Sequence, residues 1–165
     1  MSKAELAVLI CGKPAGILSQ NRNGLMRFEY SPDYSGVPLS AAMPLSNRAY
    51  GQSVVRPFLF GLLPDSERQR RAIAKESGVS ANNPVALLSV IGRDCPGAVQ
   101  FCALDAVDAV VGRPGDYRKV SDVEVASKLK SIRTDHDATW MGRDESWSLG
   151  GNQGKFALAF RNGRW

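Results

Sequence analysis

The sequence has little of what metal, disulfide-stabilised and membrane proteins require. Its only histidine is His136, and its three cysteines, Cys11, Cys95 and Cys102, form no Cys-x-x-Cys pair. This pattern argues against a zinc site and against a disulfide framework, and His136 is interpreted as an exposed loop residue. No apolar run approaches the ~20 residues of a membrane helix, and the N-terminus does not resemble a signal peptide. We therefore expect a protein of the reducing cytoplasm without membrane association.

The remaining composition is that of a globular protein. Hydrophobic residues make up 44% of the 165 positions and charged residues 22%, so disorder is not expected. The length favours one domain, or one domain and the start of another. The net charge of +5 permits nucleic acid or an acidic partner without requiring either.

Alternating and apolar segments predict an antiparallel sheet. Glu5–Cys11 is a short apolar run, and Leu25–Tyr30 alternates between apolar and charged residues, which is typical of a strand. Ile17-Leu18 between them and residues 97–104 after the helices are two further strand candidates. Prolines and glycines within 31–52 favour short extended pieces there.

Three helices are predicted after this region. The first begins at the N-cap Ser53 and ends before Pro64. The second begins at Asp65 or Ser66 as a capping box with Gln69 and ends at Gly78; Ile73 would face the core. The third has Asn83 as N-cap with Pro84 at the first helical position, ends at Gly92, and buries the apolar residues Val85, Leu87, Leu88 and Ile91.

A further capping box, Ser121-x-x-Glu124, predicts a short helix whose inward side would hold Val125, Leu129 and Ile132. Residues 133–147 are interpreted as a linker. Near the C-terminus Lys155–Phe160 predicts a strand, and Asn162-Gly163 predicts a hairpin turn. Because only two residues remain for the returning strand, we expect the chain to be cut inside a second domain.

Glycines precede this last strand in the segment from Ser148 to Lys155. Successive backbone N–H groups there can hold an anion, and a lysine can reach a phosphate. The spacing is not that of a Walker A loop, and by itself it is more typical of a flexible loop. Ser148 is interpreted either as a turn hydroxyl or as a phosphorylation site.

Two other features have a functional and a plainer reading. Arg68, Arg70, Arg71 and Lys75 give the second helix a basic face, which indicates a solvated surface or, alternatively, a nucleic-acid patch. Cys95 follows Asp94 in a turn, where a structural role is favoured over a reactive thiol.

Four stretches together resemble the N-terminal part of HipA-type toxin kinases. They are Pro38-Leu-Ser-x-x-Met-Pro-Leu45, Phe58-x-x-Gly-Leu-Leu-Pro-Asp65 with Arg68, Leu87-Leu-x-x-Ile-Gly-Arg-Asp-Cys-x-Gly-Ala98, and Ser148-x-x-Gly151-x-Gln153-x-Lys155. In this order and with this spacing, the four stretches span nearly the whole chain. The fold class expected is α+β, a mostly antiparallel sheet packed with helices, followed by the first β-hairpin of an atypical kinase N-lobe.

This resemblance implies a serine/threonine kinase that uses ATP and magnesium. The resemblance further implies that such a kinase would be held by a helix-turn-helix antitoxin (HipB-like) bound to operator DNA and would phosphorylate a protein such as an aminoacyl-tRNA synthetase to arrest translation. The resemblance also implies an ATP phosphate loop at Gly151, Asn152, Gln153, Gly154 and Lys155, and autophosphorylation at Ser148. Asn152 and Gly154 depart from the family pattern. The catalytic and metal-holding residues would lie downstream of position 165, so this chain alone is not expected to be catalytically competent.

The domain organisation predicted is a HipA N-terminal subdomain over 1–110, a connection with a short helix over 111–147, and a truncated start of the kinase N-lobe over 148–165. Two alternatives remain open at this point. One is a stand-alone, antitoxin-like module that regulates a separate kinase core, and the other is a nucleic-acid-binding module that uses the basic helix.

Overall fold

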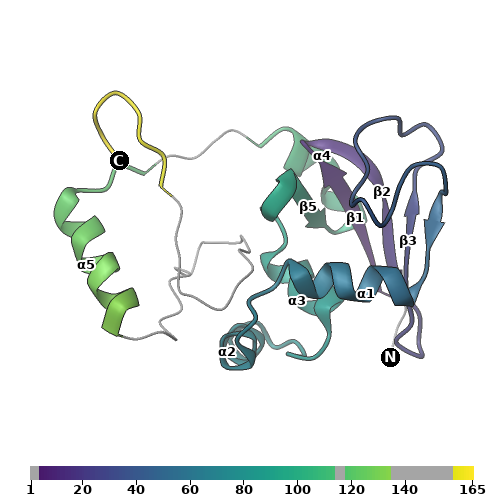
Figure 1. Cartoon of the computed structure of the whole chain (residues 1–165), viewed down its shortest axis with the longest axis horizontal. Coiled ribbons are helices and arrows are strands. Elements are labelled where there is room, and N and C mark those ends of the chain that lie inside the picture. Colours follow the sequence, from purple (N-terminus) through teal and green to yellow (C-terminus); the bar gives the residue numbers. More distant parts are fainter. Residues whose placement is uncertain (1–3, 114–117, 135–157) are drawn as a thin grey trace.

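The computed structural model describes residues 4–113, 118–134 and 158–165 and confirms the α+β class. Its centre is a five-stranded sheet in the order β4-β3-β2-β1-β5, in which every neighbouring pair is antiparallel. Figure 1 shows helices lying over one face of this sheet. The strands are β1 Ala4–Ile10, β2 Lys13–Gln20, β3 Met26–Tyr30, β4 Ala49–Tyr50 and β5 Val99–Cys102.

The turns between the strands explain the register. The β1–β2 turn places Cys11 and Gly12 at φ angles of 51° and 74°, the pair of positive values that a type I′ two-residue hairpin turn requires. Further along, Val8 pairs with Gly16 but Leu9 pairs with Pro14, so β2 carries one extra residue, the buried Ala15, as a β-bulge. Strand β5 pairs with the free side of β1, which makes β1 a central strand.

Helices α1 Gln52–Gly61 and α3 Pro84–Ile91 pack against the sheet, and α2 Glu67–Ser77 packs against α3. Between the layers lies the main core, to which alternate residues of the strands point. Its largest fully buried side chains include Phe28 and Phe101 from the sheet and Leu59, Leu87 and Leu88 from the helices. The predicted inner residues of α3 and the predicted burial of Ile73 are therefore confirmed.

A second, smaller core lies on the opposite face of the sheet. Ala7, Leu9 and Cys102 are covered there by the 3-10 turn Leu104–Ala106 and the short helix α4 Val107–Val111. The sequence did not indicate α4, because five residues are too few to show a helical period. Both faces of β1 are consequently buried.

The helix boundaries largely follow the predicted caps. Ser66 accepts a hydrogen bond from the Gln69 N–H, Gly78 is left-handed, and Asn83 accepts from the first turn of α3, all as predicted. The predicted N-cap Ser53 is wrong, because α1 begins at Gln52 with Gly51 as N-cap. The Gln52 side chain instead accepts a hydrogen bond from the Met26 N–H at 2.7 Å, which anchors the first turn to β3.

The last described helix, α5 Asp122–Thr134, contains no buried residue, and Figure 1 shows it apart from the sheet. The predicted inward side is therefore wrong within the described residues: Leu129 is 50% exposed, and Val125 and Ile132 are only partly covered. Residues 158–160, the described part of the strand predicted over Lys155–Phe160, are not in a strand. Among the residues with assigned positions, no helix is both long and apolar enough to cross a bilayer.

Candidate functional site

The residues predicted to bind nucleotide lie outside the described residues. These are Gly151, Asn152, Gln153, Gly154 and Lys155; the predicted autophosphorylation site Ser148 and the predicted loop residue His136 also lie outside the described residues. Their roles stay predictions. Across 4–113, 118–134 and 158–165, no group of three His, Cys, Asp or Glu side chains is placed to hold a metal ion.

Residues 161–164, further along the chain from the predicted loop, form the tight turn that the sequence indicated. Asn162 and Gly163 have φ angles of 51° and 74°, and Arg161 and Arg164 pair across the turn through both backbone hydrogen bonds. The rings of Phe160 and Trp165 lie 4.7 Å apart. The Val120 N–H donates to the Trp165 carbonyl oxygen at 3.2 Å, so this turn is joined to the chain just before α5.

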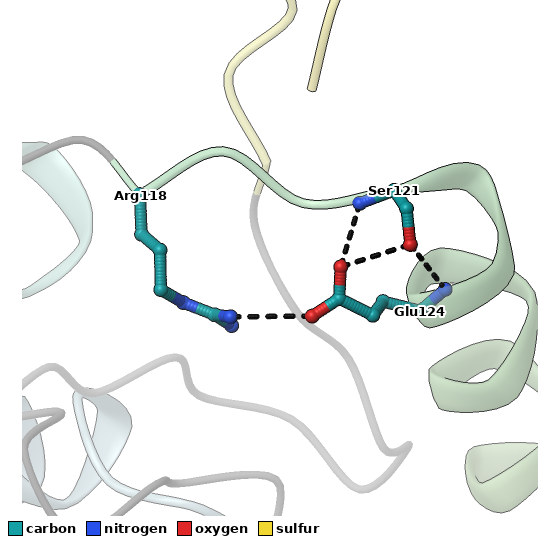
Figure 2. A network of polar contacts seen from close by, with 3 residues as sticks. All are labelled: Arg118, Ser121 and Glu124. Carbon is teal, nitrogen blue, oxygen red and sulfur yellow. Dashed lines mark hydrogen bonds and ion pairs between the residues drawn. The ribbon is translucent and has the colours of Figure 1, made fainter.

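The start of α5 is fixed by a reciprocal capping box, shown in Figure 2. The Ser121 hydroxyl oxygen accepts from the Glu124 N–H at 3.2 Å, and the Glu124 carboxylate accepts from the Ser121 N–H at 2.7 Å. Arg118 donates to the other carboxylate oxygen at 3.3 Å. The hydrogen bonds from Ser121, and then the Arg118 charge, lower the pKa of Glu124.

This capping box predicts a pH dependence for α5. Because the folded-state pKa of Glu124 lies below its ordinary value of 4.5, the stabilisation is present above pH 4.5 and is lost as the pH falls through the folded value. We expect the helical NMR shifts of the first turn of α5 to be constant from pH 7 to 5 and to weaken below pH 4.5. Glu124→Gln should remove this transition; an identical transition in that variant would contradict the assignment.

Three of the four HipA-like stretches lie in the described fold, and the first is held by tyrosine hydroxyls. Tyr30, on β3, accepts a hydrogen bond from the Leu39 N–H at 2.6 Å and donates to the Met43 carbonyl oxygen at 2.7 Å. Tyr50 donates to the carbonyl oxygen of Pro44. Leu39 and Met43 are buried, so residues 38–45 are a fixed loop in which these two motif residues serve packing.

The second stretch runs from α1 into α2 and is also held from within the domain. Leu59, Leu62 and Leu63 are buried. Arg70 donates through Nη1 to the carbonyl oxygens of Pro64 and Asp65, at 2.6 and 2.7 Å. The turn between the two helices is therefore closed by a side chain of α2.

The third stretch ends beside a pocket of about 290 Å³. Its lining includes Cys11, Asp94, Cys95, Ala98 and Arg113. Asp94 forms an ion pair with Arg113 at 2.8 Å, and Cys95 is buried with its thiol 3.6 Å from the Gly92 carbonyl oxygen. Burial raises the pKa of Cys95 to about 12, which supports the structural reading of this cysteine.

The three thiols should therefore differ sharply in reactivity. Cys11 is exposed, whereas Cys95 and Cys102 are buried and have raised pKa values. At pH 8 we expect a disulfide reagent to modify one thiol per chain quickly and the other two only on unfolding, because the thiolate is the reactive form. Cys11→Ser should remove the fast phase. Equal rates for all three thiols would show that Cys95 and Cys102 are accessible to the reagent in the folded domain, and would contradict the prediction.

The basic helix α2 is partly neutralised by its own neighbours. Arg71 forms an ion pair with Glu67 at 2.7 Å, whereas Arg70 donates hydrogen bonds to two carbonyl oxygens and keeps its charge. Glu67 and Glu76 lie on the same helix. This arrangement is that of a mixed surface and does not add support to a nucleic-acid patch.

Comparison with known proteins places the described fold in a family. The model of the HipA N-terminal domain matches residues 6–102, that is, from β1 to the last residue of β5. The chain is 39% identical over 98 residues to "Putative kinase Y4mE" of Sinorhizobium fredii, which covers 57% of this chain and 23% of that protein. It is 27% identical over 94 residues to an uncharacterized protein of Haemophilus influenzae, covering 57% and 87%.

A solved structure titled "N-terminal domain of HipA toxin" is also similar, with a TM-score of 0.44 and 21% identity over 59% of this chain and 91% of that one. The match to the Sinorhizobium fredii relative spans less than a quarter of that relative's length. The family match, in contrast, takes in more than half of this chain and almost the entire sheet. The chain therefore belongs to the HipA N-terminal domain family.

Proposed function

We propose that this chain is the N-terminal regulatory part of a HipA-type serine/threonine kinase toxin. The observation that carries the proposal is the family match over residues 6–102, supported by a 39% identical relative whose name is that of a kinase. The proposed kinase transfers phosphate from ATP to a protein substrate of the aminoacyl-tRNA synthetase class. A helix-turn-helix antitoxin would be its partner.

The gene itself provides the first test. If the reading frame continues past codon 165 into a kinase core, with an aspartate that orients the substrate hydroxyl and with metal-holding Asp and Asn residues, the proposal stands. A stop codon directly after Trp165 would contradict it and would favour a stand-alone module.

The proposed nucleotide site gives a prediction for the protein that carries this chain together with its kinase core. Lys155→Ala should weaken ATP binding by roughly 10- to 100-fold, because it removes a charge-assisted contact worth about 1.5–3 kcal/mol. Ser148→Ala should leave ATP affinity unchanged and abolish phosphate incorporation at this position. Calorimetry and mass spectrometry measure the two effects. Unchanged affinity in the first variant, or unchanged phosphorylation in the second, would contradict the assignment.

A stand-alone regulatory module is the second candidate, and one observation favours it. The aligned region accounts for 87% of the Haemophilus influenzae relative, so this domain exists there with almost no other sequence. If the same holds here, adding the purified chain to a HipA-type kinase core lacking its own N-terminal domain should inhibit the kinase at stoichiometric concentration. Failure to bind that core would exclude this candidate.

A further inference from the structure

We propose that the surface formed by α1 and α2 binds an acidic segment of a partner protein through two arginines, Arg56 and Arg70, that lie against one phenylalanine, Phe60. This assignment goes beyond the proposed function, because it concerns a surface of the described domain and does not depend on the predicted ATP loop. We call these three residues the arginine–phenylalanine cluster.

The geometry of the cluster joins two helices. The Cζ atom of Arg56 lies 4.6 Å from the ring centroid of Phe60, one turn along α1, and the Cζ atom of Arg70 on α2 lies 5.9 Å from the same centroid. Both distances are within the range of cation–π contacts. Arg56 is exposed, and Phe60 and Arg70 are partly exposed, so a partner can reach all three side chains.

Arg70 is held in place before any partner binds. Its Nη1 donates to the carbonyl oxygens of Pro64 and Asp65, and its remaining N–H groups have no acceptor among the described residues. A fixed guanidinium loses less conformational entropy on binding than a mobile one. The cluster therefore presents free hydrogen-bond donors at low entropic cost.

The charges of the cluster are not balanced within the described part of the chain. Arg27, Arg71, Arg113 and Arg118 each have a carboxylate partner, whereas Arg56 and Arg70 have none in those ranges. Both guanidinium groups lie within 6 Å of one ring centre, so their charges are within about one Debye length, ~10 Å at 0.1 M salt. An anion that contacts both guanidinium groups would balance their charge.

Carboxylates fit this arrangement better than a nucleic acid does. A guanidinium binds a carboxylate through two parallel hydrogen bonds, and stacking on the ring leaves its N–H edge open. Duplex DNA, in contrast, requires about 6–10 phosphate contacts for strong binding. Arg71, the neighbour of Arg70 in the sequence, is already paired with Glu67 and is less available to a phosphate. A short acidic peptide segment needs only Arg56 and Arg70, which have no carboxylate partner among the described residues.

The experiment titrates the isotope-labelled 165-residue chain with acetyl-hexaglutamate-amide and follows the arginine Nε–Hε NMR signals. We expect the signals of Arg56 and Arg70 to shift and those of Arg71 to stay, while acetyl-hexaglutamine-amide causes no shift. Arg56→Gln should weaken peptide binding tenfold or more. Arg56→Lys, which keeps the charge but loses the planar fork, should not restore it.

Arg71→Gln is the matched control, since it removes the same charge one residue from Arg70 but from a guanidinium already paired with Glu67. It should change the affinity less than twofold. Equal losses in the Arg56 and Arg71 variants, absence of peptide binding at millimolar concentration, or tighter binding to a 20-base-pair DNA duplex would each overturn the proposal. Unchanged thermal unfolding of Arg56→Gln checks that the fold is retained.

Discussion

Gly16→Ala is expected to destabilise the domain by about 3 kcal/mol, a large part of the ~5–15 kcal/mol that holds a typical domain. Gly16 lies at the bulge of β2, between Val8 of β1 and Tyr30 of β3. A Cβ atom there would lie 2.1 Å from the Glu29 carbonyl oxygen. Because this oxygen belongs to the backbone of the neighbouring strand, the sheet itself would have to move.

Thermal unfolding followed by circular dichroism measures this effect, with an expected fall in Tm of roughly 12–24 °C. Gly61→Ala is the control, because a Cβ at Gly61, the last residue of α1, meets no atom within 4 Å. Alanine there should be neutral or stabilising by up to about 1 kcal/mol. A Gly16 variant as stable as the Gly61 variant would show that the bulge can rearrange.

Tyr30→Phe is expected to cost about 2–4 kcal/mol, since it removes one hydroxyl that serves two buried backbone groups. Without it, the Leu39 N–H and the Met43 carbonyl oxygen lose their partner. Burial raises the pKa of Tyr30, so the hydroxyl is protonated and able to donate at neutral pH. Ring packing against Phe28 and Tyr34 is kept by phenylalanine, which isolates the hydroxyl.

Urea unfolding of Tyr30→Phe and of Tyr34→Phe compares the loss in free energy of unfolding that each variant causes. The Tyr34 hydroxyl donates only to the Val37 carbonyl oxygen in a less buried position, so its loss should cost about 1 kcal/mol or less. Amide exchange should also become faster at Leu39 in the Tyr30 variant alone. If both variants lose the same small amount, the hydroxyl of Tyr30 does not hold the loop over residues 38–45.

Local signals made the sheet and two of the helices predictable. The alternation of Met26, Phe28 and Tyr30 between charged residues identifies β3 because that strand has one buried face. Asn83 and Pro84 define the start of α3 because cap and first-turn chemistry are encoded within four residues. The same holds for Ser66 and Gly78 at the ends of α2.

Helix α4 and the start of α1 could not be predicted from the sequence, because both depend on contacts between distant segments. Helix α4 exists because Val107 and Val110 find Ala7 and Leu9 on β1, a contact across about 100 positions that no local pattern reveals. The start of α1 depends on a hydrogen bond between Gln52 and β3, and it overrode the cap preference of Ser53.

The candidate site, too, could be predicted only in part. The HipA-like stretches could be located by residue type, but the reason for them could not: Leu39 and Met43 owe their positions to Tyr30, and Pro64 owes its position to Arg70. The arginine–phenylalanine cluster was visible in the sequence only as a basic helix, since its aromatic member belongs to α1. The roles of Ser148 and Lys155 stay predictions.

The placement of β1 has a consequence for synthesis of the protein on the ribosome. Ile10 pairs with Val99, and at roughly 5–20 residues per second about 4–18 seconds pass between the translation of these two positions. During this interval one edge of β1 lacks its neighbour, and Leu9 also lacks the later α4 cover. The nascent chain must therefore keep an apolar strand from aggregating until about residue 110 has emerged.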